Sequence, residues 1–236
     1  MKCLEIKPSK LSGIVNIPPS KSMAHRAIIC AFLSDGVSEI DNIELSEDIL
    51  STCHAVKTLG GDIDILEGTQ TNRKKLIIYG SGTVSVKNDS INCGESGTTA
   101  RFIMPVSRLT EEPVTIEGKG KLISRPFDVF YPIFDSSKIS YKTTDGKLPL
   151  TLKGRLKPGD YSLRGDISSQ FISGLLLALP LLDKDSTIQI TTKLQSAAYI
   201  DMTIYMQRIF GVTVHFNKED NRLIIPGNQK YIPQKY

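Results

Sequence analysis

The sequence predicts a mixed α/β (α+β) fold built from three repeated units, and three observations support this prediction. Apolar strands that close on a glycine recur at a period near 73 residues and end at Gly80, Gly154 and Gly227. The helix starts that open the units keep the same step, and so do short apolar strands near their midpoints. A fixed period of this kind is typical of repeated supersecondary units.

The sequence pattern of each unit predicts the order helix, strand, helix, strand, turn, strand. In the first unit, apolar residues recur over 24–32 at the spacing of a one-sided helix, which residues 35–36 end. The segment VSEIDNI follows as a strand. Ser46 is then the expected N-cap of a second helix, with acidic residues in the first turn where the helix dipole favours them, and this helix stops at residues 60–61.

The second and third units repeat this order. The second contains TTARFIMPVSRL, VTIEG, SRPFDVFYPIF and ISYKT, and the third contains SSQFISGLLLALPLL, TIQIT, SAAYIDMTIYMQRIF and VTVHF. The predicted units span 13–80, 81–154 and 155–227. Because the third opening helix is almost entirely apolar, we expect the helices to lie inside and the strands outside.

Composition limits the class of protein. With 236 residues, of which 40% are hydrophobic and 23% charged, the chain is expected to be soluble and globular. The longest apolar stretch, 171–182, is too short for the ~18 to 20 residues that span a membrane, and no signal peptide is visible, which favours a cytoplasmic location. The spacing of the cysteines predicts neither a zinc site nor a disulfide framework. They are Cys3, Cys30, Cys53 and Cys93.

Cations gather at the predicted helix starts, although the net charge is only +4. A helix start offers unpaired N–H groups and the positive end of the dipole, so Lys or Arg placed there favours a phosphate or carboxylate site. Residues 20–22, 95–99 and 168–170 hold equivalent positions in the three units. If the opening helices are parallel, these three starts meet on one surface.

Other kinds of site have little support. His25, His54 and His215 lack metal-ligand spacing, and the loop 118–120 has no nucleotide-binding motif. We therefore expect no metal, no cofactor and no Ser-His-Asp triad. A non-catalytic module that binds anions or nucleic acid stays open as an alternative, although no aromatic stripe, basic run or helix-turn-helix pattern supports nucleic acid.

Five motifs carry a resemblance to a known family. PPSKSMAHRA, CGESGTTARF, SRPF, GDISSQF and SAAYIDMT follow one another over nearly the whole chain. In this order they resemble the N-terminal half of the 5-enolpyruvylshikimate-3-phosphate synthase family. The family of UDP-N-acetylglucosamine enolpyruvyl transferases is the alternative within the enzyme class, and PxSKSxxxRA with SSQF favours the former.

The resemblance implies a fold and an activity. The family has two lobes, each made of three βαβαββ units with helices inside and sheets outside, an inside-out barrel, and the active site lies between the lobes. It transfers the enolpyruvyl group of phosphoenolpyruvate to the 5-hydroxyl of shikimate 3-phosphate, in chorismate and aromatic amino-acid biosynthesis. The reaction passes through a tetrahedral intermediate that loses phosphate.

The resemblance also implies roles for individual residues, with Lys21 and Arg101 as the catalytic ones. The residues expected to bind phosphoenolpyruvate are Lys21, Gly97, Arg101, Arg125 and Gln170. Those expected to bind shikimate 3-phosphate are Lys21, Ser22, Arg26, Ser168, Ser169, Gln170, Ser196 and Tyr199. Arg125 can grip an anion through two parallel hydrogen bonds, as a lysine cannot.

Three features depart from the family pattern. Glu95 stands where an asparagine is common, and Ala197-Ala198 replace a basic residue and a proline, which removes a cation near the shikimate phosphate. The acid/base carboxylates and lysine of the second lobe have no counterpart here, and residues 228–236 are expected to cross to that lobe. We therefore expect a monomeric substrate-binding lobe that is inactive alone, has the second lobe as its partner, and binds neither nucleic acid nor membrane.

Overall fold

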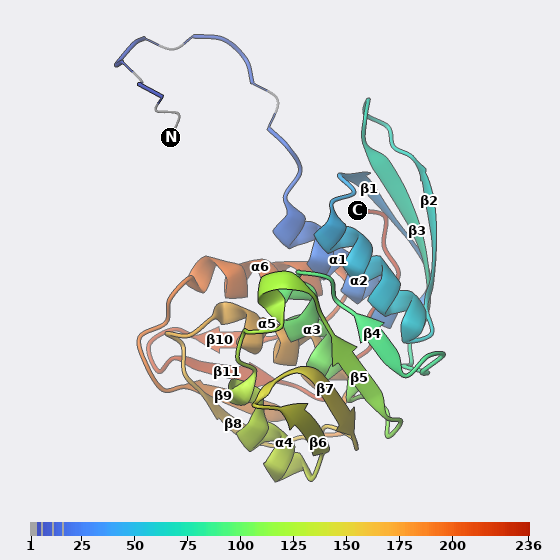
Figure 1. Ribbon diagram of the computed structural model, residues 1–236, viewed down its shortest axis with the longest axis vertical. Helices are drawn as coiled ribbons and strands as arrows, with labels where there is room; N and C mark the ends of the chain where they lie inside the picture. Colours follow the sequence, from blue (N-terminus) through green and yellow to red (C-terminus); the bar gives the residue numbers. More distant parts are fainter. Residues whose placement is uncertain (1–3, 6, 11, 16) are drawn as a thin grey trace.

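The computed structural model describes residues 4–5, 7–10, 12–15 and 17–236 (Figure 1). Cys3, one of the four cysteines considered above, lies outside the described residues. Before the first helix, the described residues extend away from the rest of the chain (Figure 1). Within the described part of the chain, no helix is long and apolar enough to cross a membrane.

The strands form three separate sheets. The first sheet is antiparallel, in the order β1-β3-β2, with β1 (Asp35–Ile43), β2 (Asp62–Glu67) and β3 (Lys74–Ser81). The second has the order β4-β5-β7-β6, with β4 (Ser90–Asn92), β5 (Val114–Glu117), β6 (Ser140–Thr144) and β7 (Lys147–Lys153). The third has the order β8-β9-β11-β10, with β8 (Asp160–Leu163), β9 (Ser186–Ile190), β10 (His215–Asn217) and β11 (Arg222–Ile225).

Residues 231–236 occupy the outer edge of the first sheet. The N–H of Glu39 donates to the carbonyl of Gln234 over 2.9 Å, and the N–H of Tyr236 donates to the carbonyl of Glu39 over 2.8 Å, in a parallel arrangement with β1. In the other two sheets the corresponding edge is held by β4 and β8, each parallel to its neighbour. The segment predicted as a crossover therefore lies along β1, where the other sheets have their opening strand.

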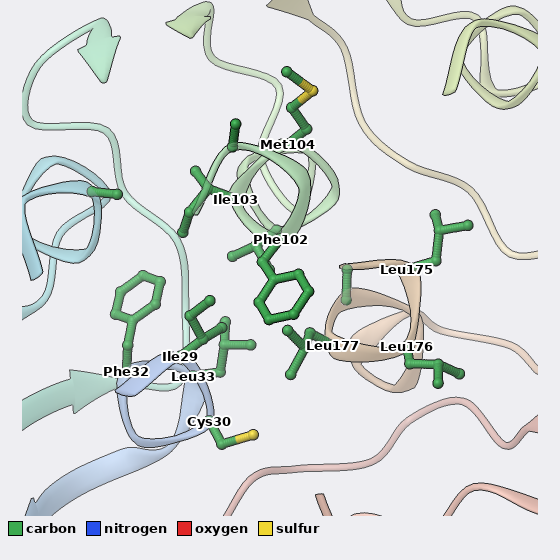
Figure 2. Packing of buried hydrophobic residues seen from close by; sticks show 14 of the residues in the cluster. Ile29, Cys30, Phe32, Leu33, Phe102, Ile103, Met104, Leu175, Leu176 and Leu177 are labelled. Carbon is green, nitrogen blue, oxygen red and sulfur yellow. The ribbon is translucent and has the colours of Figure 1, made fainter. Parts of the chain in front are cut away.

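Five of the helices pack on one another. α1 (Lys21–Leu33) contacts α2 (Glu47–Thr58) and α6 (Ala197–Ile209), while α3 (Gly97–Ser107) contacts α2 and α5 (Ser169–Ala178), and α5 contacts α6. Figure 2 shows Phe102 of α3 pointing between Leu177 of α5 and the α1 residues Ile29 and Leu33. The core of the molecule is continuous through these helices.

Two predictions of local structure were wrong. α1 was expected to bury one face, but all ten residues of 24–33 are buried, because helices and strands contact α1 on several sides. The segment 124–134 was expected to form one helix. Instead it contains a 3₁₀ turn, η2 (Asp128–Phe130), followed by the start of α4 (Tyr131–Ser137), and a second turn, η1 (Gly120–Leu122), precedes it. Pro132 lies in the first turn of α4, where proline is tolerated, and cannot continue a helix that began earlier.

The helix starts were predicted well. Ser46 caps α2 by accepting the N–H of Ile49 over 3.4 Å, as the sequence indicated. Ser96 caps α3 in the same way through the N–H of Thr99 over 3.1 Å. These hydroxyls satisfy N–H groups that a helix otherwise leaves unpaired.

At Gly174, α5 lies directly on the backbone of α3. A Cβ at this position would overlap the carbonyl oxygen of Arg101 and lie 3.3 Å from the Cα of Phe102. Since a buried helix has little room to move, only glycine fits here without a shift.

We predict that Gly174→Ala lowers the free energy of unfolding by roughly 1 to 3 kcal/mol, because overpacking outweighs the better helix propensity of alanine. Urea unfolding measures the change. Gly159→Ala is the matched control, since its Cβ would meet nothing within 4 Å. A Gly174→Ala protein as stable as the parent would contradict this account of the α3–α5 contact.

Candidate functional site

A cavity of about 500 Å³ opens where α5 and α6 begin. It is lined by side chains from the starts of α1, α3, α5 and α6 and from the loop before η2. Eight of its ten lining residues were predicted from the sequence. The lining residues are Ser22, Arg101, Arg125, Ile167, Ser168, Ser169, Gln170, Gln195, Ser196 and Tyr199.

Two of these residues were missed. Ile167 and Gln195 line the cavity, although neither was considered. Each comes directly before a helix-start serine, Ser168 and Ser196 respectively. Extending each predicted helix start by one residue toward the N-terminus would have included both.

The starts of α5 and α6 differ in how they are capped. Ser168 caps α5 by accepting the N–H of Gln170 over 3.3 Å, and Ser169 beside it is buried. Ser196 has a left-handed backbone, with φ 60°, and its hydroxyl caps no N–H among the described residues. Because a helix N-terminus is electropositive, both starts favour an anion in the cavity.

Two guanidinium groups converge on Gly97 at the start of α3. A Cβ on Gly97 would lie 2.7 Å from Nη1 of Arg125 and 2.9 Å from Nη1 of Arg101, so any larger residue would displace them. Nη1 of Arg101 donates to Oε1 of Gln170 over 2.9 Å, and Nε2 of Gln170 donates to Oγ1 of Thr98 over 2.8 Å. The glycine therefore makes room for the pair, and Gln170 fixes one member.

The positive charge of this pair is not compensated. Among the described residues, neither Arg101 nor Arg125 has a carboxylate within 4.0 Å. Arg101 is 9% exposed, and its Nε has no hydrogen-bond partner there. Burial lowers the pKa of Arg101 to about 10, and the charge of Arg125 adds to this effect. Since two like charges in a partly dry site are costly, the arrangement favours a bound phosphate or carboxylate.

Arg26, predicted to touch a substrate, does not line the cavity. Its guanidinium is buried, and the resulting desolvation lowers the pKa of Arg26 to about 10. Nη1 donates to the carbonyl of Ser22 over 2.7 Å, and Nη2 donates to the carbonyl of Tyr199 over 2.9 Å. Ser22 and Tyr199 both line the cavity, so Arg26 braces its wall by joining α1 to α6.

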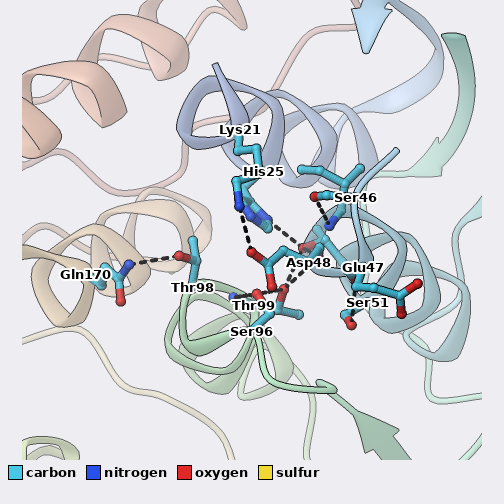
Figure 3. A network of polar contacts seen from close by, with 12 residues as sticks. Lys21, His25, Ser46, Glu47, Asp48, Ser51, Ser96, Thr98, Thr99 and Gln170 are labelled. Atoms are coloured by element: carbon cyan, nitrogen blue, oxygen red, sulfur yellow. Dashed lines mark hydrogen bonds and ion pairs between the residues drawn. The ribbon is translucent and has the colours of Figure 1, made fainter. Parts of the chain in front are cut away.

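Lys21 also lies outside the cavity lining. Its Nζ is 3.0 Å from Oδ2 of Asp48, in the first turn of α2, and the pair is largely exposed (Figure 3). Glu95, the departure from the family pattern beside the arginine pair, is exposed and packs against Gly120, where a Cβ would meet its Oε2 at 2.7 Å.

No carboxylate lines the cavity in the described part of the chain. Arg164 donates to both oxygens of Asp166 over 3.0 and 2.7 Å, and these bonds hold the pKa of Asp166 well below its usual range. Asp201 pairs with Lys218 over 3.1 Å. Both acids are thus engaged in ion pairs outside the cavity, whose polar lining consists of guanidinium, hydroxyl and carboxamide groups.

The described residues contain no cluster of three His, Cys, Asp or Glu side chains that could hold a metal ion. Cys30, Cys53 and Cys93 are free and buried. Burial raises the pKa of Cys53 to about 11 and that of Cys93 to about 12, so neither thiol is activated. Cys93 therefore lacks the character of a reactive cysteine.

The fold and cavity define an α/β protein in which helix starts and an uncompensated pair of arginines face one cavity, an arrangement that favours small anions. Comparison with known proteins identifies the kind of protein more closely. The chain belongs to the EPSP synthase family, because the family model described as EPSP synthase (3-phosphoshikimate 1-carboxyvinyltransferase) matches residues 6–236.

Individual relatives agree with this assignment. The 3-phosphoshikimate 1-carboxyvinyltransferase of Clostridium kluyveri is 51% identical over 231 residues, which cover 98% of this chain and 53% of that protein. The protein of the same name from Clostridium novyi is 47% identical over 239 residues, covering 100% of this chain and 55% of that protein. The chain thus spans about half the length of these curated relatives.

A solved structure shows the same fold. EPSP synthase from Acinetobacter baumannii superposes with a TM-score of 0.80 at 24% identity, over 94% of this chain and 48% of that one. The family resemblance found in the motifs is confirmed, and the UDP-sugar and nucleic-acid alternatives are not favoured by the relatives.

A buried histidine beside the site makes stability depend on pH. His25 is 3% exposed, and burial lowers its pKa from 6.5 to about 4. Below pH 6.5 the unfolded chain binds a proton that the folded chain does not accept until near pH 4. We predict a loss of about 3 kcal/mol of stability from this group as the pH falls through that window.

Urea unfolding at pH 7, 5.5 and 4.5 measures this loss. His25→Asn should flatten the pH dependence by that amount, while His215→Asn, at an exposed histidine, should leave it as steep as in the parent. An equally steep dependence in His25→Asn would show that other groups cause it.

Proposed function

We propose that this chain is the substrate-binding lobe of an enzyme that transfers the enolpyruvyl group of phosphoenolpyruvate to the 5-hydroxyl of shikimate 3-phosphate. The observation that carries the proposal is the uncompensated pair Arg101 and Arg125, which faces the same cavity as the serines at the starts of α5 and α6. Two anion-binding regions side by side suit a reaction between two anionic substrates. The names of the relatives support this choice.

The lining divides into two ends. Arg101, Arg125 and the start of α3 at Gly97 form the end that would take phosphoenolpyruvate. The end that would take shikimate 3-phosphate is formed by Ser22, Ser168, Ser169, Ser196 and Tyr199. Gln170 lies between the two ends and is already bonded to Arg101. Lys21, which directly precedes the cavity-lining Ser22, would meet both substrates, and Arg26 would act through its bonds to the backbone of Ser22 and Tyr199.

We also propose that the architecture is one lobe of an inside-out barrel with three βαβαββ units at 13–80, 81–154 and 155–227. The three sheets and the mutual packing of α1, α3 and α5 with their neighbours support this arrangement. The second lobe would be the partner that covers the cavity, and the complete enzyme would be a monomer.

The cavity can supply positioning and charge stabilisation. Guanidinium groups and helix ends fixed before the substrates arrive would stabilise the negative charge of the tetrahedral intermediate. Proton transfer to the methylene carbon, and from the hydroxyl, needs acid and base groups within hydrogen-bond reach. Since no carboxylate lines the cavity among the described residues, these groups would come from the second lobe.

We predict that the 236-residue chain binds shikimate 3-phosphate weakly and that Ser169→Ala weakens this further. Loss of one charge-assisted hydrogen bond in a partly buried site costs roughly 1.5 to 3 kcal/mol. Titration calorimetry measures the affinity. Ser162→Ala, at an exposed serine of β8 outside the cavity, is the control and should leave the affinity unchanged. Identical isotherms for Ser169→Ala and the parent would place the site elsewhere.

We further predict that these 236 residues alone release no phosphate from the two substrates above background, because no carboxylate lines the cavity among the described residues to act as general acid or base. Adding the separately expressed second half of the Clostridium kluyveri relative should restore release if the surfaces match. Phosphate is measured with a coupled colorimetric assay. Robust release by the chain alone, abolished by Glu95→Gln, would overturn the proposal and make Glu95 the acid/base group.

A further inference from the structure

Asp48 joins the starts of three helices, α1, α2 and α3 (Figure 3). Its carboxylate lies 3.0 Å from Nζ of Lys21 in α1, while its own backbone belongs to the first turn of α2. The hydroxyl of Thr99, in α3, donates to the carbonyl of Asp48 over 3.3 Å. Neither the sequence motifs nor the cavity lining singles out this residue.

A buried chain of polar groups holds the backbone of Asp48 in place. Thr52 Oγ1 is 2.7 Å from Thr99 Oγ1 and also donates to the carbonyl of Asp48 over 3.3 Å. Nδ1 of His25 is 2.7 Å from the same Thr52 hydroxyl. Both threonines are fully buried, and buried hydrogen bonds are costly to break. The first turn of α2 is therefore fixed relative to α1 and α3.

The Lys21–Asp48 pair differs from the pair Arg101 and Arg125 in that its cation has a carboxylate partner. Arg101 and Arg125 have no acidic neighbour in the described part of the chain, whereas Lys21 has one at hydrogen-bond distance. A carboxylate beside an anion site opposes anion binding by its charge. A lysine side chain, in turn, loses rotamer freedom when it is ordered, which weakens any binding that has to order it. Asp48 can therefore favour anion binding only if its ordering of Lys21 before binding outweighs its repulsion of the anion.

We infer that Asp48 is a positioning residue that orders the ammonium of Lys21, next in the chain to the cavity-lining Ser22, for the anionic substrates. The inference rests on the proposed function, in which Lys21 meets both substrates. The hydroxyls of Thr52 and Thr99 keep Asp48 aligned with α1, so the starts of α1, α2 and α3 are fixed relative to one another. Asp48 thus touches no substrate and acts through Lys21.

The affinity for shikimate 3-phosphate tests whether Asp48 favours or opposes binding. Asp48→Asn removes a negative charge near the site, so a bystander carboxylate would make shikimate 3-phosphate bind more tightly. A positioning residue has the opposite effect, and we expect calorimetry to show affinity weakened about three- to tenfold. Asp62→Asn is the matched control, because Asp62 pairs with Lys57 of the same helix, far from the cavity lining, and its loss should change affinity less than twofold. Equal or tighter binding by Asp48→Asn overturns the inference.

The lysine signal tests the ordering directly. In a ¹H–¹⁵N spectrum of lysine ammonium groups, Lys21 should give a protected signal that Asp48→Asn abolishes and Asp62→Asn leaves intact. Thr52→Val, which removes the hydroxyl at similar volume, should weaken both the Lys21 signal and the affinity. Thr52→Ser, which keeps the hydroxyl, should leave both as in the parent. A Lys21 signal that survives in Asp48→Asn overturns the inference.

The two proposals fail in different ways. A parent chain that binds no shikimate 3-phosphate overturns the proposed function, and with it the role of Asp48 toward that substrate. A parent chain that binds the substrate with the same affinity as Asp48→Asn overturns the role of Asp48 alone.

Discussion

The close approach of α3 and α5 is the constraint on which the site depends. Gly174 lets the backbone of α5 rest on the carbonyl of Arg101, so the two helices share one buried surface. At the same separation, the side chain of Arg101 reaches Gln170 in the first turn of α5. A wider spacing would break this bond and move the anion-binding end of the cavity away from the serine end. Packing in the core thereby sets a distance that the chemistry needs.

Three buried arginines show how the same residue type serves two purposes. Burial lowers the pKa of Arg26, Arg101 and Arg108 alike, to about 10. Arg108 donates to the carbonyls of Gly154 and Glu112 over 3.0 Å each, and Arg26 donates to two carbonyls of the cavity wall. Arg101 alone retains a buried nitrogen without a partner among the described residues. Unsatisfied hydrogen-bonding capacity therefore separates the arginine available to a ligand from those that brace the fold.

Local signals in the sequence predicted most of the elements, and the family resemblance supplied most of the residues that line the candidate cavity. Caps such as Ser46 and Ser96 depend on neighbouring residues only, so spacing was enough to find them. The burial of α1 on all sides and the pairing of residues 231–236 with β1 arise from contacts distant in sequence, which no local pattern contains. Contacts distant in sequence also explain why Arg26 does not line the cavity. Arg26 was expected to bind a substrate, but its guanidinium turns toward α6, where Nε donates to Oγ1 of Thr203, 177 residues away.

The departure at Ala197-Ala198 can be understood from the start of α6. Alanines offer no cation, so an anion at this end meets only the helix dipole, worth roughly half a charge, and the hydroxyls of nearby serines. Ser196 leaves its hydroxyl free of any capping bond within the described residues, and its left-handed backbone turns the chain into the helix. A phosphate carries up to two negative charges, which these groups neutralise only in part. In the proposed function, the remaining charge would be met across the cavity, so the serine end would bind a phosphate fully only when the second lobe covers it.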